Sequence, residues 1–283
     1  MNKTVFFGAF ALATALALPA LADSAAAEKA YSQRDYTAPG IKSAQEAADL
    51  YAQEAAKEAN PIVKAKYLTG QAEALYFVGA ASQANSEKID KHLKGMDVAV
   101  VAVAAFGIKD VTKVSPDDVK KLKALPADQL AILAAALYQR GINLGQWGAA
   151  NGVMKSLSKW PELKANMQII IDLGQGKINE YGPYRVLGRG YYKIPSMLGG
   201  SVDKAIQYLS SAIKGSKAPG QNYSVNGFNN TFYAEALNNN GKSAEAKQLL
   251  NDFLKADPKT LEPALAPENK QAQSDAKDLL KSW

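Results

Sequence analysis

The sequence contains no cysteine and only one histidine, His92. Without cysteine the chain cannot form disulfides, a thiolate nucleophile, an iron–sulfur cluster or a zinc–thiolate site. A single histidine excludes multi-histidine metal sites, and a Ser-His-Asp hydrolase would have to use His92 itself as its base. Composition therefore argues against most redox enzymes and against histidine-rich metalloenzymes.

Strand-like patterns and an excess of one charge are also scarce. The formal net charge is only +6, from 33 basic and 27 acidic residues spread along 283 positions. No segment alternates apolar and polar residues with the β-branched enrichment of a strand. The lysine-rich stretch 120–123 lacks interleaved aromatic residues, so we expect no nucleic-acid partner. A hydrophobic content of 47% is typical of a globular chain.

The first 22 residues have the composition of a secretory signal peptide. Lys3 is the only charged residue before Asp23, residues 5–18 are apolar or small, and Pro19 precedes Ala20-Leu21-Ala22. This order predicts cleavage after Ala22, because small residues precede the cleavage point of exported proteins. The apolar stretch is shorter than the ~20 residues that span a membrane, and a retained anchor is the alternative. An exported chain without cysteine fits a bacterial periplasm.

Capping residues and prolines divide the rest of the chain into helices. Residues 23–42 contain Pro39-Gly40 and are interpreted as a flexible leader. Ser43 with Glu46 has the spacing of a capping box and predicts a helix to about Ala59. Further helix starts of this kind stand at Asn60-Pro61, Asn85-Ser86, Ser115-Pro116, Pro126 and Pro161. We therefore predict an all-α fold of about ten to thirteen helices.

Two of these helices carry more specific expectations. The uncharged run 98–108 is about half as long as a membrane span, and is interpreted as a buried central helix. The helix that starts at Pro161 is expected to continue towards Glu180.

Helix pairs repeat most clearly over residues 180–258. One group has the offsets of a tetratricopeptide repeat: Tyr233, Ala234, Leu237, Gly241, Ala246, Leu250, Phe253 and Pro258. The preceding segment shows the same pattern of small and apolar residues, with an insertion around 194–200 between its two helices. The residues that carry the pattern are Leu187, Gly188, Tyr191, Ala205, Leu209 and Ala212. One pair cannot bury its apolar face alone. We therefore expect a single domain over 43–283, stacked as a solenoid or compact α-α superhelix.

The same region resembles a known family. The segments that carry the likeness are Tyr184-Arg185-Val186-Leu187-Gly188-Arg189-Gly190-Tyr191-Tyr192-Lys193-Ile194-Pro195, Leu198-Gly199-Gly200, Lys204-Ala205, Asn226 to Asn230 before Phe232-Tyr233, and Pro267-Glu268-Asn269-Lys270. Together they resemble the T components of TRAP transporters, which are periplasmic helical-repeat proteins, over about residues 180–282. The resemblance implies a protein without catalytic activity or cofactor. The resemblance further implies that the protein binds a small organic or apolar ligand, a transporter's substrate-binding subunit, or both. Well-known members are lipid-anchored, whereas this chain has no cysteine to acylate.

Candidate ligand-binding residues lie within this segment. Arg185, Arg189 and Tyr192 follow one another at spacings of four and three, so they share one helix face, and Tyr184 lies beside them towards the core side. A guanidinium can hold a carboxylate through two parallel hydrogen bonds, and a tyrosine ring can contact an apolar body. The pattern therefore indicates a groove for a small organic acid. The alternative is that both arginines are solvated or pair with an acid such as Glu180 or Asp203.

Asn229 and Asn230 complete the candidate set. Asparagine oxygens accept hydrogen bonds from the free N–H groups at a helix start, so the asparagines from 222 to 230 can cap the following helix. The functional alternative is that Asn229 or Asn230 faces the groove and holds a polar group of the ligand. We identify no catalytic residues and no metal ligands.

The sequence thus favours an exported, non-enzymatic binding or scaffold protein. Its expected partners are a substrate-binding subunit of a transporter, another envelope protein, or a small organic ligand. A general adaptor for envelope proteins is the alternative function, and a cell-wall hydrolase is a third hypothesis. A solenoid with an exposed apolar edge is also compatible with homo-oligomers.

Overall fold

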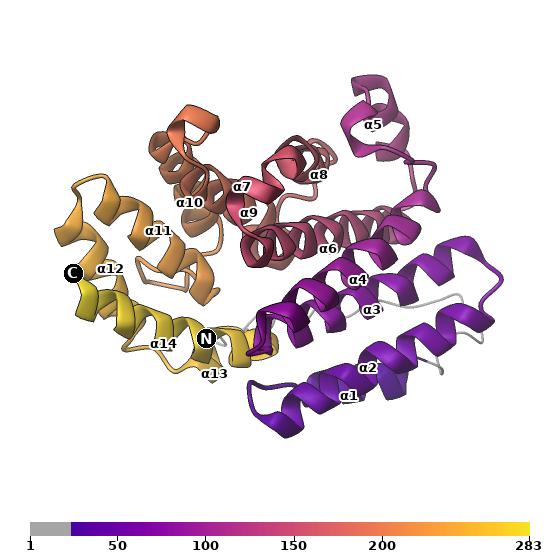
Figure 1. Cartoon of the computed structure of the whole chain (residues 1–283), viewed down its shortest axis with the longest axis horizontal. Coiled ribbons are helices and arrows are strands. Elements are labelled where there is room, and N and C mark those ends of the chain that lie inside the picture. Colours follow the sequence, from indigo (N-terminus) through magenta and orange to yellow (C-terminus); the bar gives the residue numbers. More distant parts are fainter. Residues whose placement is uncertain (1–23) are drawn as a thin grey trace, which may run out of the picture.

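The computed structural model describes residues 24–283, and all regular secondary structure in this part of the chain is helical (Figure 1). The one β-type pairing among these residues is an isolated bridge between Lys217 and Ser224. The predicted all-α fold is therefore confirmed. Within the described part, no helix has the length and apolar character needed to cross a bilayer. The predicted signal peptide, residues 1–22, and its cleavage point lie outside the described residues.

Four helices form the first part of the fold, and each packs against the next in chain order. They are α1 (Ala25–Ser32), α2 (Ala38–Lys57), α3 (Pro61–Ala81) and α4 (Asn85–Ala104). The predicted start at Pro61 is confirmed: the Asn60 side chain accepts hydrogen bonds from the N–H groups of Ile62 and Val63. Local capping chemistry alone therefore placed this helix boundary correctly.

The prediction of a flexible leader at 23–42 is wrong. Residues 25–32 are helical, and Ala27 and Ala30 are buried. Helix α2 begins before Ser43, with Thr37 as its N-cap and Pro39 in its first turn. Proline is well suited to a first turn, because the N–H group that it lacks has no partner there in any case. The helical domain therefore includes the segment that we had assigned to the leader.

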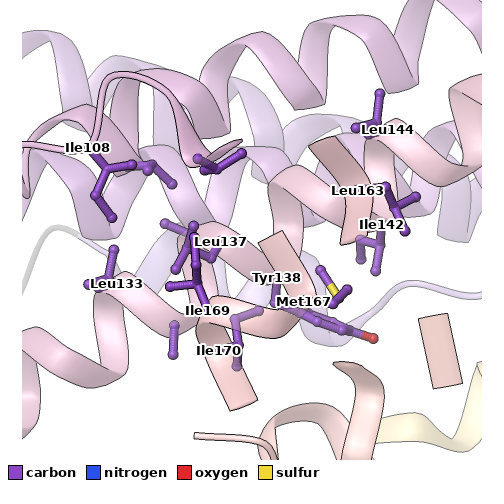
Figure 2. Close-up of a cluster of buried hydrophobic side chains, with 14 of the residues drawn as sticks. Ile108, Leu133, Leu137, Tyr138, Ile142, Leu144, Leu163, Met167, Ile169 and Ile170 are labelled. Carbon is purple, nitrogen blue, oxygen red and sulfur yellow. The ribbon is translucent and has the colours of Figure 1, made fainter. Parts of the chain in front are cut away.

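The centre of the molecule is built around one long helix. The elements of this region are η2 (Val111–Lys113), α5 (Pro116–Lys123), α6 (Ala127–Asn151), α7 (Val153–Ser156), η3 (Leu157–Lys159) and α8 (Trp160–Asp172). Helix α6 packs against α3, α4 and α8. Figure 2 shows the core that results, in which Leu133 and Leu137 of α6 meet Met167 and Ile170 of α8, all fully buried. The same buried cluster includes Ala65 of α3 and Leu187 further along the chain, so it joins the first helices to the last third of the fold.

The interpretation of 98–108 as a buried helix is wrong in part. Helix α4 ends at Ala104, and Ala102 and Val103 are buried. Val101, however, is 55% exposed. The absence of charge in this run therefore does not mean that the helix is covered on all sides.

The last third contains the repeats. Its elements are α9 (Ile178–Lys193), η4 (Ser196–Leu198), α10 (Val202–Gly215), α11 (Gly227–Asn239), α12 (Ser243–Phe253), α13 (Pro258–Leu261), η5 (Pro263–Leu265) and α14 (Ala266–Ser282). The predicted pairs are α9 with α10 and α11 with α12, and both pairs pack closely. Gly241 makes the turn of the second pair with φ of 77°. The repeat residues Ala234, Leu237, Ala246 and Leu250 are fully buried, so the predicted repeats are confirmed.

The expected continuation of the helix at Pro161 towards Glu180 is wrong. The helix ends at Asp172, and Gly174 follows with φ of 78°. Helix α9 then starts with one left-handed turn, in which Asn179, Glu180 and Tyr181 have φ values of 48°, 53° and 61°. For non-glycine residues this conformation costs roughly 1–2 kcal/mol each. Other parts of the fold must therefore hold the turn in place.

The described chain curls back so that the connection between its first two helices contacts the last helix. Arg34, between α1 and α2, directs Nε and Nη2 to the two carboxylate oxygens of Glu268 in α14, at 3.1 and 3.2 Å. Nη2 also donates to the carbonyl oxygen of Ala264 at 2.6 Å, and the guanidinium lies 4.2 Å from the centre of the Tyr31 ring. Figure 1 places α14 beside the ends of the first helices. A bidentate ion pair thus joins the first and last parts of the described fold.

Candidate functional site

Arg185, the first predicted site residue, is buried inside the protein and already has partners. It is only 7% exposed. Its Nη2 donates to the hydroxyl of Tyr138 at 2.6 Å and to Oδ1 of Asn179 at 2.5 Å. Its Nη1 donates to the carbonyl of Asn179 at 3.2 Å and to Oδ1 of Asn229 at 3.0 Å. These four bonds occupy both terminal nitrogens, so the predicted role of Arg185 in holding a carboxylate ligand is not supported.

These bonds hold the left-handed turn at the start of α9. Tyr138 of α6 also donates from its hydroxyl to Oδ1 of Asn179 at 2.9 Å. Asn229 of α11 donates from Nδ2 to the carbonyl of Glu180 at 2.9 Å. Burial raises the pKa of Tyr138 to about 12, while the nearby Arg185 guanidinium opposes this rise. The cluster therefore acts as a buried clamp made of residues from α6, α9 and α11.

Asn229 and Asn230 are both fully buried, and neither faces a groove. Asn230 accepts from the N–H of Ser224 at 2.8 Å and donates to the carbonyl of the same residue at 3.0 Å. Capping of α11 is done by Asn226, which accepts from the N–H of Phe228. The two asparagines thus tie the α10–α11 loop to α11, and the predicted ligand contact is not supported for either.

Tyr184 belongs to a ladder of aromatic rings along the seam of α9 and α10. Its ring centre lies 5.8 Å from that of Tyr181 and 6.4 Å from that of Tyr208. Tyr208 stacks in turn on Tyr191, at 5.7 Å and an interplanar angle of 7°. Burial raises the pKa of Tyr208, and the neighbouring tyrosines add to the rise. Tyr184 therefore packs between two helices and lies apart from Arg189.

Arg189 is the predicted residue that reaches an open cleft. The cleft has a volume of about 370 Å³, and α9, α11 and α14 supply its lining: Arg189, Thr231, Phe232, Glu235, Asp275, Asp278 and Leu279. The guanidinium stacks on the Phe232 ring at 4.1 Å and lies 5.5 Å from the centre of the Tyr192 ring. We call this cleft the Arg189 cleft, and it is the candidate functional site.

Glu235 is the acid that pairs with this cationic edge, rather than Glu180 or Asp203. One of its carboxylate oxygens accepts from Nη1 of Arg189 at 2.5 Å, and the other lies 3.7 Å from Nζ of Lys193. Burial lowers the pKa of Lys193, and Arg189 lowers it further, while Glu235 opposes the shift. Arg189 and Lys193 thus share one carboxylate, and of these three residues Arg189 and Glu235 line the cleft.

The opposite edge is acidic. Asp275 of α14 is half-buried and accepts from Nε2 of Gln271 at 2.8 Å. No cation forms a salt bridge with Asp275 in residues 24–283, whereas Asp278 pairs with Lys281 at 3.0 Å. Burial raises the pKa of Asp275, and the carboxylates of Asp278 and Glu235 add to the rise, while the hydrogen bond from Gln271 and the Arg189 guanidinium oppose it. The Arg189 cleft therefore presents charges of opposite sign from two different helices.

Sequence reasoning missed the residues of α11 and α14 that complete the cleft. Phe232 and Glu235 lie three residues apart in α11, which places them on one face beside Arg189. That spacing could have indicated a shared face, but nothing in the sequence indicates that α14 lies opposite. A second cleft, of about 530 Å³, lies between η2, α5 and α8 and contains none of the predicted residues.

No group of three or more potential metal ligands occurs among the described residues. Comparison with known proteins finds neither a matching family model nor a matching curated protein.

Proposed function

We propose that the chain is an exported, non-enzymatic binding protein that takes a small organic ligand in the Arg189 cleft. The observation that carries the proposal is the cleft itself, where a partly exposed guanidinium stacks on Phe232 at 4.1 Å. Ligand sites are typically concave and largely apolar, with a few placed polar groups, and occupy about 300–1,000 Å³. The cleft, at about 370 Å³, falls in this range.

The stacked helix pairs are also in keeping with a scaffold protein of the TRAP T-component kind. In such a role the protein would transfer its ligand to a substrate-binding subunit in the periplasm, or would receive the ligand from that subunit. The buried clamp around Arg185 supports the cleft indirectly, because it fixes α9 against α11 and so positions Arg189 over Phe232. A preorganised wall of this kind reduces the entropy that binding must offset.

Two measurements test the proposal on the mature protein. Mass spectrometry of molecules that co-purify with it should identify a small organic compound. A thermal shift series with small carboxylic acids should raise the melting temperature, since a ligand of the folded state stabilises it. The Arg189→Gln variant should lose this shift. Lys120→Gln, an exposed change in α5 distant from the cleft, should keep it.

If no compound co-purifies and no acid shifts the wild-type melting curve, the ligand-binding function is wrong. A general adaptor for envelope proteins then becomes the better reading of the fold.

A further inference from the structure

The Arg189 cleft has opposite charges on walls that come from different helices. Arg189 and Lys193 of α9 share the single carboxylate of Glu235. Only Nη1 of Arg189 is engaged in a hydrogen bond with the described residues. Nε and Nη2 therefore remain available to an acceptor that enters the cleft. This wall suits a carboxylate, which a guanidinium binds through charge-assisted hydrogen bonds.

The facing wall suits a cation. Asp275 is half-buried, has no salt-bridge partner in residues 24–283, and shares the cleft with the carboxylates of Asp278 and Glu235 as well as with the Arg189 guanidinium, which is already paired with Glu235. Neighbouring carboxylates repel one another, and an ammonium group placed among them relieves that repulsion. Since Lys281 already pairs with Asp278, the carboxylate left for a ligand is that of Asp275.

Apolar surface lies between the two charged walls. Phe232 of α11 and Leu279 of α14 both line the cleft. Helix α11 packs against both α9 and α14, so its residues form the floor between them. A ligand that bridges the walls would place its hydrocarbon part against this floor.

From this arrangement we propose that the Arg189 cleft binds a small zwitterion, a molecule with one carboxylate and one ammonium group. The carboxylate would bind Arg189, the ammonium group Asp275, and the apolar part Phe232 and Leu279. A free amino acid and a short peptide share this chemistry. The inference rests on the proposed function, and it adds the requirement that both charges be present in one ligand.

Isothermal titration of the mature protein near neutral pH tests the requirement with matched probes. Leucine and Leu-Leu carry both charges, 4-methylpentanoate carries only the carboxylate, and 3-methylbutylamine carries only the ammonium group. We expect at least one zwitterion to bind at least about tenfold more tightly than either singly charged probe, the effect of one lost charged contact. Comparison of leucine with Leu-Leu distinguishes an amino acid from a peptide as the source.

Two variants assign the charges to the walls. Asp275→Asn keeps an acceptor for Gln271, and it should bring the zwitterion down to the affinity of the acid. Arg189→Gln should weaken the zwitterion and the acid alike by about tenfold or more. Lys120→Gln should bind as the wild type does, and circular dichroism should show the same helical content for all three variants.

Equal affinity for leucine and 4-methylpentanoate would overturn the inference and leave the proposed function standing. Tighter binding by the zwitterion that Asp275→Asn does not weaken would also overturn it, because the ammonium group would then lie elsewhere. If no probe binds at about 10 mM, which corresponds to less than roughly 3 kcal/mol, the inference is wrong. The co-purification experiment then decides separately whether the cleft holds another ligand.

Discussion

Replacing Glu180 with glycine should stabilise the protein, although glycine usually weakens a helix. Glu180 is the middle residue of the left-handed turn, with φ of 53° and ψ of 57°. Its backbone carbonyl accepts from Asn229, and its side chain forms no hydrogen bond or ion pair with the part of the chain that the structure describes. Glycine would therefore keep the one hydrogen bond that fixes this residue and remove the clash of Cβ.

The magnitude follows from two opposing effects. Releasing a non-glycine residue from the left-handed conformation gains about 1–2 kcal/mol. The greater freedom of glycine in the unfolded chain costs about 0.5–1 kcal/mol. Burial also raises the pKa of the half-buried Glu180 carboxyl, so its removal is not unfavourable. We expect a net gain of about 1 kcal/mol in the free energy of unfolding.

Urea denaturation of the mature protein measures this difference. The matched control is Gln207→Gly, an exposed position within the regular helix α10, where glycine should lose about 1 kcal/mol. The two variants should thus differ by about 2 kcal/mol with opposite signs. If Glu180→Gly destabilises the protein as much as Gln207→Gly does, residue 180 is not left-handed and our account of the clamp is refuted.

Three further predictions concern buried positions. Arg185→Met should lower the free energy of unfolding by about 3–5 kcal/mol in urea, because it strands the polar atoms of Tyr138 and Asn229; a loss below about 1 kcal/mol would contradict this. Burial lowers the pKa of His92 from 6.5 to about 4. The unfolded chain therefore takes up a proton that the folded chain does not. The free energy of unfolding should fall by about 3 kcal/mol as the pH drops from 6.5 to about 4. The His92→Gln variant should show a smaller fall over the same pH range. Gly188→Ala should lower the melting temperature, because the new Cβ would come within 2.5 Å of Leu209 Cγ and overpacking costs about 1–3 kcal/mol; an unchanged melting curve would mean that α9 and α10 are further apart.

The sequence predicted best what depends on neighbouring residues. The predicted helix starts at Ser115 and Asn60 are confirmed, because such caps act within one helical turn. The capping box predicted at Ser43 and Glu46 is wrong, since α2 already begins at Ala38 and Ser43 lies inside it. The repeat residues Leu237 and Leu250 are buried for a related reason, since their helices follow one another in the chain and pack together. The left-handed turn was not predicted, because distant residues hold it in place.

The candidate site shows the limit of helical periodicity. The spacing correctly places Arg185 and Arg189 on one face of α9, but it does not show what covers that face. Arg185 lies under α11 and the left-handed turn and is 7% exposed, whereas the Arg189 side chain, one turn later, is 27% exposed. The other wall of the Arg189 cleft, at Asp275, exists only because α14 folds back beside α11, and no local pattern in the sequence encodes that packing.

The ion pair between Arg34 and Glu268 has a consequence for assembly. A helical-repeat array with free ends can add a second copy end to end, and repetition of that step produces a filament. Here Arg34, directly after the first described helix, is paired with Glu268 of the last helix. A second copy that added end to end at this point would have to break that ion pair, which disfavours this route to a filament.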